Sequence, residues 1–183
     1  MLPAILTWFY CLSITKAALL VLAVSMVYLV LHHYLNKKNV WRAAVVFLCL
    51  AWIIVIVAAT LTDRPPGTNP AEPELLPFHS YRTVMAGENP ELLRSNFMNA
   101  VLFYPAGLLG CDVLPGSWSR KWRVFVVVAF CGLLSLGIEC AQYLFALGQA
   151  EVDDVIHNGL GALMGGTFCE LRPRRTPSHK NRT

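Results

Sequence analysis

Glu139 and Gln142 are the polar residues with the clearest chemical potential, because they stand in the otherwise uncharged run of residues 124–147. That run is long enough to cross a bilayer. A carboxylate in the middle of a spanning helix costs about 2.5–3.5 kcal/mol on insertion scales, so it normally faces protein or water inside a bundle. Gln142 follows Glu139 by less than one turn and lies on the same helical face. The pair predicts a ligand-binding or proton-transfer site, with interhelical hydrogen bonding as an equal alternative.

A second polar group opens the last hydrophobic segment, where Asp153 and Asp154 precede a run rich in glycine. From Asp154 the spacing continues with Asn158, Gly161 and Gly165, which places these four residues on one stripe of a helix. The polar half of the stripe predicts the wall of a site, and the two glycines predict a face for close helix packing. Asp153 fits a helix cap, or an acid favoured by the helix dipole, as well as it fits a site.

A third group, Arg94, Asn96 and Asn99, begins an earlier hydrophobic segment. Arg94 is either an anchor at the level of the lipid headgroups or the cation that neutralises the buried carboxylate or holds a phosphate. Further along the same segment, Pro105 and Gly107 are expected to kink the helix and to permit close packing.

The composition assigns the chain to the integral membrane proteins. Of its 183 residues, 56% are hydrophobic and only 14% are charged, whereas a soluble domain carries about 25% charged residues. Hydrocarbon contains no partner for the backbone, so the predicted fold is all-α: a compact bundle of about five transmembrane helices. The predicted spans are residues 14–35, 43–61, 97–114, 122–147 and 155–171. The last three contain polar residues and are therefore expected to form the core of the bundle.

Loop charges predict the orientation of the bundle. Basic residues cluster at 37–42, 120–123 and 172–182, which all fall on one side of the membrane, whereas the loops at 63–94 and 147–154 are acidic on balance. The positive-inside rule then places the N-terminus outside and the C-terminus in the cytoplasm.

The chain is expected to divide into an additional N-terminal transmembrane segment (1–40), a helical membrane domain (41–171) and a basic cytoplasmic tail (172–183). Residues 1–13 lack a basic n-region and a small-residue cleavage site, so a cleaved signal peptide is not expected. They either extend the first span or lie along the membrane interface. The six cysteines have no paired spacing and are expected to be small buried hydrophobes.

In this orientation the third, fourth and fifth spans bring their polar groups to one depth near the outer surface. The predicted ligand-binding residues of this outward-facing site are Arg94, Asn96, Asn99, Glu139, Gln142, Asp153, Asp154 and Asn158. If the site is catalytic, Glu139 and Asp154 are the candidate catalytic residues. The acids lack the spacing of known zinc or phosphate-binding motifs, so neither a metal nor a cofactor is predicted, and no nucleic-acid partner is expected.

The polar blocks of the chain resemble those of the VanZ-like membrane proteins. The resemblance is carried by residues 99–107 (Asn-Ala-Val-Leu-Phe-Tyr-Pro-Ala-Gly), residues 138–142 (Ile-Glu-Cys-Ala-Gln) and residues 153–165, in the same order and spacing. Residues 76–78 (Leu-Pro-Phe) resemble a Pro-Phe loop that these proteins carry in the same place. The resemblance covers about residues 41–169 and identifies the membrane domain as VanZ-like.

The resemblance implies a multi-pass protein of a bacterial plasma membrane. The family's namesake is associated with low-level resistance to teicoplanin, a lipoglycopeptide that acts outside the membrane on cell-wall precursors. This chain departs from the family pattern at Glu151, at His157 and in its additional N-terminal hydrophobic segment. The first two departures change the chemistry expected at the site, and the third leaves open whether the chain contributes to antibiotic resistance or has another task in the cell envelope.

Three functions are compatible with these residues. The favoured one is a non-enzymatic binder of a lipid headgroup, a cell-wall lipid precursor or a lipoglycopeptide, reached through an apolar groove between the third and fifth spans, lined by Leu102 and Leu163. An enzyme that acts on a lipid headgroup, with Glu139 as general base, is the first alternative. The second is a small structural or assembly subunit that docks a membrane protein partner through Gly161 and Gly165. Membrane lipids are expected partners in every case.

Overall fold

The computed structural model describes residues 14–35, 38–61 and 72–172, which form six helices. These are α2 (Ile14–Tyr34), α3 (Lys38–Leu61), α4 (His79–Met85), α5 (Glu91–Val113), α6 (Arg120–Leu144) and α7 (Val152–Leu171). Over the described residues, helices are accompanied by a single isolated backbone bridge, between Glu74 and Glu151, and by no strand. The prediction of an all-α fold is confirmed.

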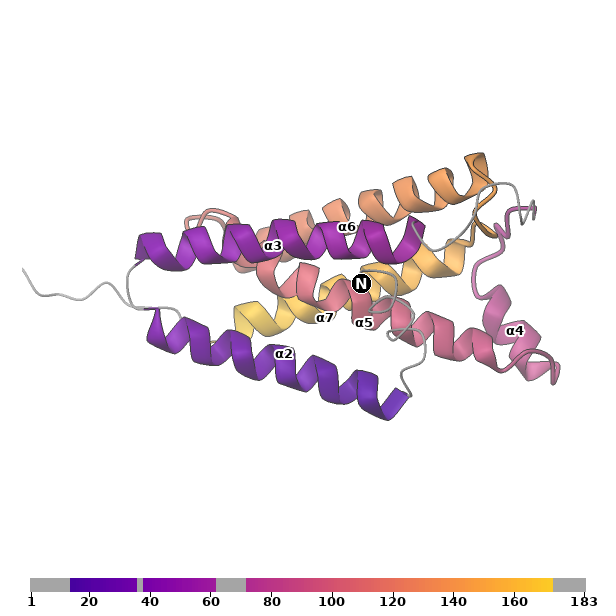
Figure 1. Ribbon diagram of the computed structural model, residues 1–183, viewed down its shortest axis with the longest axis horizontal. Coiled ribbons are helices and arrows are strands. Elements are labelled where there is room, and N and C mark those ends of the chain that lie inside the picture. The colour runs from indigo at the N-terminus through magenta and orange to yellow at the C-terminus, as the bar shows by residue number, and fades with distance from the viewer. Residues whose placement is uncertain (1–13, 36–37, 62–71, 173–183) are drawn as a thin grey trace, which may run out of the picture.

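The long helices run along one axis, with α5 and α7 in the middle of the bundle (Figure 1). α2 packs against α5 on one side, and α3 and α6 cover α5 and α7 on the other. The short α4 lies at one end, beside the start of α5 and near the start of α7, and we call this the α4 end. We call the opposite end, where α6 begins and α7 finishes, the Arg123 end.

Three of the described helices, α2, α3 and α6, are long and apolar enough to cross a membrane. Helices α5 and α7 have 23 and 20 residues, which suffices for hydrocarbon about 30 Å thick, but they are more polar. The chain is therefore a helical membrane protein. Two statements remain predictions: α5 and α7 also span the membrane, and the N-terminus lies outside.

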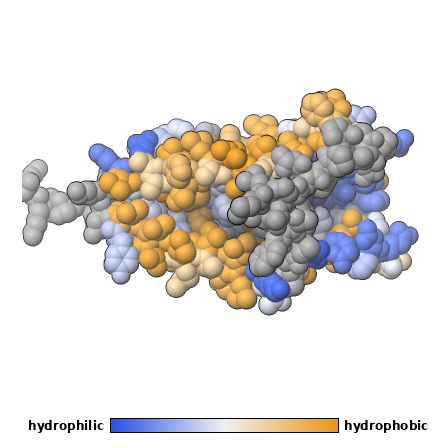
Figure 2. Space-filling view, in the orientation of Figure 1, coloured by the Kyte–Doolittle hydropathy of each residue, from blue (hydrophilic) through white to orange (hydrophobic). Residues whose placement is uncertain are grey.

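The surface of the bundle has the polarity that a bilayer requires. Large apolar side chains of α2 and α3 are exposed, among them Leu22, Phe47 and Ile54 at 62%, 71% and 68%. Hydrophobic residues dominate the middle of the face seen in Figure 2, whereas hydrophilic residues gather toward its ends. An exposed apolar belt of this size fits contact with lipid chains.

Glycines bring the backbones of α5 and α7 into direct contact. A Cβ atom added to Gly161 would lie 2.1 Å from the carbonyl oxygen of Ala100, and one added to Gly165 would lie 2.0 Å from that of Tyr104. Gly107 on α5 has the same relation to the carbonyl oxygen of Ala162, at 2.1 Å. Only glycine fits at such distances, so these three residues allow the most extensive helix contact in the bundle.

This close packing corrects the expectation of a groove between the third and fifth spans. Leu102 is buried, with 3% of its surface exposed, and residues 101–109 of α5, which include Pro105, are all buried. Leu163 instead faces a hollow between α6 and α7. Because Gly161 and Gly165 are covered by α5, they offer no free surface for docking another protein.

Several predictions concern parts of the chain outside the described residues. These are the placement of residues 1–13 and the basic tail from residue 173 onward. Of the cysteines that the structure describes, Cys111, Cys131 and Cys169 are buried, as expected for small hydrophobes, whereas Cys140 is exposed.

Candidate functional site

The chain before α4 lies against the start of α7. Glu74 donates its N–H to the carbonyl oxygen of Ala150 at 2.8 Å, and the N–H of Val152 donates to the carbonyl oxygen of Glu74 at 3.0 Å. These two backbone bonds hold the segment around residues 74–78 beside the loop that connects α6 to α7. The Leu-Pro-Phe segment is thereby placed next to the paired aspartates of α7.

Asp153 fixes this segment with its side chain. The carboxylate of Asp153 accepts hydrogen bonds from the N–H of Phe78, the N–H of Ser80 (2.9 Å) and the hydroxyl of Ser80. Phe78 has a left-handed backbone conformation, with φ of 61°, which is unusual for a residue with a bulky side chain. Bonds from backbone N–H groups to a carboxylate are strong. The bond from the N–H of Phe78 to Asp153 therefore helps to hold Phe78 in the left-handed conformation. Asp153 is buried, with 2% of its surface exposed, and its carboxylate bonds to the start of α4. The side chain therefore positions α4.

Two further bonds attach α4 to the long helices. Asn96 on α5 donates from Nδ2 to the hydroxyl oxygen of Ser80 at 2.7 Å. His157 on α7 bonds through Nε2 with the hydroxyl of Tyr81 at 2.7 Å, and its Nδ1 lies 2.6 Å from the carbonyl oxygen of Asp153. The rings of Tyr81 and His157 are stacked. The histidine is thus a buried structural contact between α7 and α4.

Glu139 and Gln142 connect α6 to two different parts of the chain. The Oε2 atom of Glu139 accepts the N–H of Glu151 at 2.9 Å, where α7 is about to begin. Gln142 donates from Nε2 to the carbonyl oxygen of Thr60, at the end of α3, at 3.1 Å. Both side chains are buried, with 6% and 4% exposed. Each of these two bonds is made to a backbone group, and a ligand role for Glu139 and Gln142 stays a prediction.

Asn99 and Asn158 differ from the other amides of the cluster, because each has a buried polar atom that lacks a hydrogen-bond partner among the described residues. Asn158 donates from Nδ2 to the hydroxyl of Ser135 on α6 at 2.7 Å, but its Oδ1 is unpartnered. The unpartnered atom of Asn99 is Nδ2. The two residues lie at a similar height, since Ala100, next to Asn99, contacts Gly161, one turn beyond Asn158.

Arg94 and Asp154 lie at the margin of the cluster. Arg94 forms an ion pair with Glu91 at 3.2 Å, one turn earlier on α5. Asp154, in the first turn of α7, is partly exposed, and its N–H donates to the carbonyl oxygen of Glu151 at 3.2 Å.

Glu151 has a strongly altered acidity. It lies just before α7, and partial burial raises the pKa of its carboxyl to about 7, with further upward contributions from the charges of Asp154 and Asp153. His79 acts in the opposite direction. A group that titrates near neutral pH at the edge of a polar cluster is a candidate for proton exchange.

The arrangement offers hydrogen bonds rather than metal coordination. Over the described parts of the chain, no three His, Cys, Asp or Glu side chains are placed to hold a metal ion. The side chains brought together at the α4 end are Asn96, Asn99, Glu139, Gln142, Asp153 and Asn158, from three long helices, with Ser80 and Tyr81 from α4.

A second buried cluster, at the Arg123 end, was not predicted from the sequence. Arg123 lies 3.1 Å from Glu170 and 3.5 Å from Asp112, and its Nε donates to the carbonyl oxygen of Cys111 at 3.0 Å. Arg172 pairs with the same Asp112. Sequence reasoning treated Arg123 as a loop charge and overlooked Glu170, although an acid within an apolar run was the signal that had singled out Glu139.

Aromatic residues of the N-terminal helices complete this second cluster. The hydroxyl of Tyr28 donates to Asp112 at 2.8 Å, and the guanidinium of Arg172 lies 5.2 Å from the centre of the Tyr28 ring and 5.8 Å from that of Trp41. The charges therefore hold α2 and α3 onto the ends of α5 and α7.

A helical bundle with apolar outer faces and a buried polar cluster at each end defines a class of helical membrane protein. The family model for VanZ/LLP1 matches residues 43–172, and the chain belongs to this family. The match begins within α3, so α2 precedes the family region. No curated protein and no solved structure matches the chain.

Proposed function

We propose that this chain is a non-enzymatic membrane protein whose α4 end binds the polar part of a lipid-linked molecule. The observation that carries the proposal is a pair of buried atoms, Nδ2 of Asn99 and Oδ1 of Asn158, that lack a hydrogen-bond partner among the described residues. A buried polar atom without a partner costs about 1–3 kcal/mol. A donor and an acceptor left unpartnered at similar height, beside groups that are well bonded, fit a site that a ligand completes.

The polarity of the site favours a neutral ligand group. Asn99 offers an N–H donor and Asn158 a carbonyl acceptor, which together match an amide or the hydroxyl of a sugar. The nearby carboxylates of Glu139, Glu151 and Asp153 disfavour a phosphate by charge repulsion. The recognised group is therefore an amide or sugar rather than the anionic group considered for Arg94.

The family and the loop charges support a membrane setting for this proposal. In a bacterial plasma membrane, with five spans and the N-terminus outside, the α4 end faces the compartment where cell-wall precursors are used. A polyprenyl-linked precursor and a lipoglycopeptide such as teicoplanin both carry amides and sugars beside a lipid tail. Tolerance to teicoplanin would follow if the chain sequestered either molecule.

Titration of the full chain in nanodiscs tests the proposal. The probes are a polyprenyl-linked peptidoglycan precursor and teicoplanin, added separately and followed by isothermal calorimetry. We expect saturable binding of at least one probe, and we expect mass spectrometry to recover that probe unchanged. Absence of saturable binding of both probes contradicts a binding role. Time-dependent conversion of a probe that Glu139→Gln abolishes would instead favour the enzyme alternative.

A further inference from the structure

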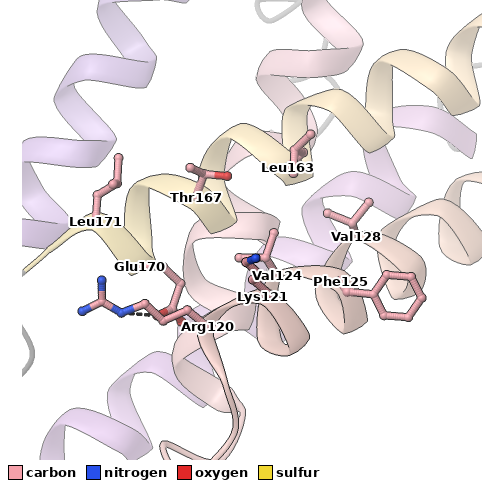
Figure 3. A pocket seen from close by; sticks show the side chains of 9 residues that line it. All are labelled: Arg120, Lys121, Val124, Phe125, Val128, Leu163, Thr167, Glu170 and Leu171. Carbon is pink, nitrogen blue, oxygen red and sulfur yellow. Dashed lines mark ion pairs between the residues drawn. The ribbon is translucent and has the colours of Figure 1, made fainter.

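A hollow of about 490 Å³ lies between α6 and α7 at the Arg123 end (Figure 3), and none of the residues that line it belongs to the polar cluster at the α4 end. Val124, Phe125 and Val128 of α6 form one wall, and Leu163 and Thr167 of α7 form the other. Its volume is within the range of small-molecule sites, about 300–1,000 Å³. The walls are almost entirely apolar and lie on helices that pack within the membrane region of the bundle.

Two cations stand at the mouth of this hollow. Arg120 and Lys121 open α6, and both side chains are exposed, with 54% of the Arg120 side chain accessible. The carboxylate of Glu170 also lines the mouth, but it lies 3.1 Å from the buried Arg123 and 4.0 Å from Arg120. With Asp112, which pairs with Arg123 and Arg172, two acids face four cations, so the mouth keeps a positive charge.

Exposed aromatic side chains indicate the depth of this mouth in a bilayer. Trp118 and Trp122, on either side of Arg120 and Lys121, are 37% and 50% exposed. Tryptophan is enriched at the level of the lipid headgroups, and basic side chains there attract anionic lipids. The two cations are thus at headgroup height, and the hollow extends from them toward the hydrocarbon.

The length of the hollow corresponds to one leaflet. Seven residues separate Lys121 from Val128 and eight separate Leu163 from Leu171, which gives about 11–12 Å at 1.5 Å per residue. Half of a hydrocarbon core about 30 Å thick is about 15 Å. An acyl chain of a lipid in that leaflet can therefore lie along the hollow while its headgroup remains at the mouth.

We propose that this hollow binds an anionic glycerophospholipid, with one acyl chain between α6 and α7 and its phosphate between Arg120 and Lys121. Glu170 keeps the Arg120 side chain at the mouth and disfavours a second negative charge deeper inside. In the orientation that the loop charges predict, the site opens to the cytoplasmic leaflet. The site is separate from the one proposed for the α4 end.

Native mass spectrometry of the full chain tests this proposal. The protein is taken from membranes of equal parts phosphatidylglycerol and phosphatidylcholine, and the retained lipid is counted. We expect one retained phosphatidylglycerol in several-fold excess over phosphatidylcholine. The R120Q/K121Q variant should lose this preference, whereas R42Q, which removes an exposed cation from the start of α3, should keep it. Equal retention of both lipids by the wild type, or loss of the preference in R42Q as well, overturns the proposal.

A second pair of variants tests the acyl-chain part of the site. Val128→Trp with Leu163→Trp fills the hollow and should remove the retained lipid. Leu133→Trp with Leu136→Trp adds the same bulk to exposed positions of α6 outside the hollow and should leave it bound. Identical retention by the two double variants contradicts the proposed position of the chain.

Crosslinking of the unmodified protein decides the question even if a variant does not fold. Phosphatidylglycerol with a photoreactive acyl chain should label peptides from residues 121–128 and 163–171. Labelling confined to α2 and α3 overturns the proposal, and so does a dimeric mass without lipid, since a second copy would then cover this face.

Discussion

Replacing Asn99 by leucine and Asn96 by leucine should change stability in opposite directions. The two residues lie three positions apart on α5, so the same substitution is tested on one helix. Nδ2 of Asn96 donates to Ser80, and Asn96 is 3% exposed. Nδ2 of Asn99 is buried and has no partner among the described residues. The comparison therefore isolates the cost of an unpartnered donor.

The expected magnitudes follow from hydrogen-bond energetics. N96L removes one bond between side chains, which in membrane proteins contributes about 0.6 kcal/mol and at most about 1.7 kcal/mol. N99L removes a desolvation penalty of about 1–3 kcal/mol, and the lower value applies because Asn99 is only partly buried. We expect N96L to unfold more easily by about 1 kcal/mol and N99L to be more stable by about 1 kcal/mol.

Chemical denaturation in mixed micelles and probe binding in nanodiscs measure the two effects together. N99L should gain stability and bind the responsive precursor or lipoglycopeptide at least about tenfold more weakly, which corresponds to about 1.4 kcal/mol. N96L should keep its affinity in the folded fraction. If N99L is less stable than the wild type, Asn99 braces the fold. If it binds the probe unchanged, Asn99 is not a ligand contact.

Three further changes test the packing and the charges of the bundle. Gly165→Ala should destabilise the protein by about 1–3 kcal/mol in the same denaturation assay, because its Cβ would meet a backbone oxygen of α5; Gly159→Ala, on an open face of the same helix, should be neutral or slightly stabilising, and equal effects would contradict the close packing. Arg123→Met should lower the free energy of unfolding by about 3–5 kcal/mol, because it leaves the buried Glu170 without its cation. Adding Glu170→Met in the same chain should restore part of this stability. A double variant that is no more stable than R123M would exclude the coupling between the two side chains. The pKa of Glu151 is raised to about 7, against 4.5 for the free group, so the protonated carboxyl stabilises the fold fully below pH 4.5 and this stabilisation is lost as the pH rises through 7. Between pH 5 and pH 8 the melting temperature of the wild type should therefore fall more than that of Glu151→Gln. Parallel curves of melting temperature against pH for the two proteins would contradict the shift.

The hydrophobic runs predicted the long helices well but not where the helices begin. α3 begins at Lys38 rather than at residue 43, and α5 begins at Glu91 rather than at residue 97. The added first turns are polar, and the helix of a membrane protein can continue beyond the hydrocarbon to the level of the headgroups, where charged side chains are tolerated. Hydropathy alone follows the hydrocarbon and therefore underestimates such helices.

The partners of the predicted polar residues were harder to infer. The position of Glu139 within an apolar run and of Asp153 at the start of another identified both acids as unusual, but their partners are backbone N–H groups of Phe78, Ser80 and Glu151. Every residue type except proline carries such a donor, so no side-chain pattern marks it. These contacts depend on the path of the chain before α4 and of the loop before α7, which is fixed only by the tertiary fold.

The two ends of the bundle compensate their buried acids in different ways, and this difference determines what each can bind. At the α4 end, Asp153 and Glu139 accept hydrogen bonds from backbone N–H groups. These bonds satisfy the carboxylate oxygens but do not neutralise their negative charge. At the Arg123 end, Asp112 and Glu170 face arginines, and further cations remain at the surface. A neutral polar ligand therefore suits the first end and an anionic lipid the second.

The two sites should also fail independently, because they lie at opposite ends of the bundle and share no residue. N99L should leave the retention of phosphatidylglycerol unchanged, and R120Q/K121Q should leave binding at the α4 end unchanged. If either variant loses both lipid retention and probe binding, the helices transmit a structural change from one end of the bundle to the other. The backbone contact of Gly165 with α5 is then the place to test, since it joins the two clusters through packed helices.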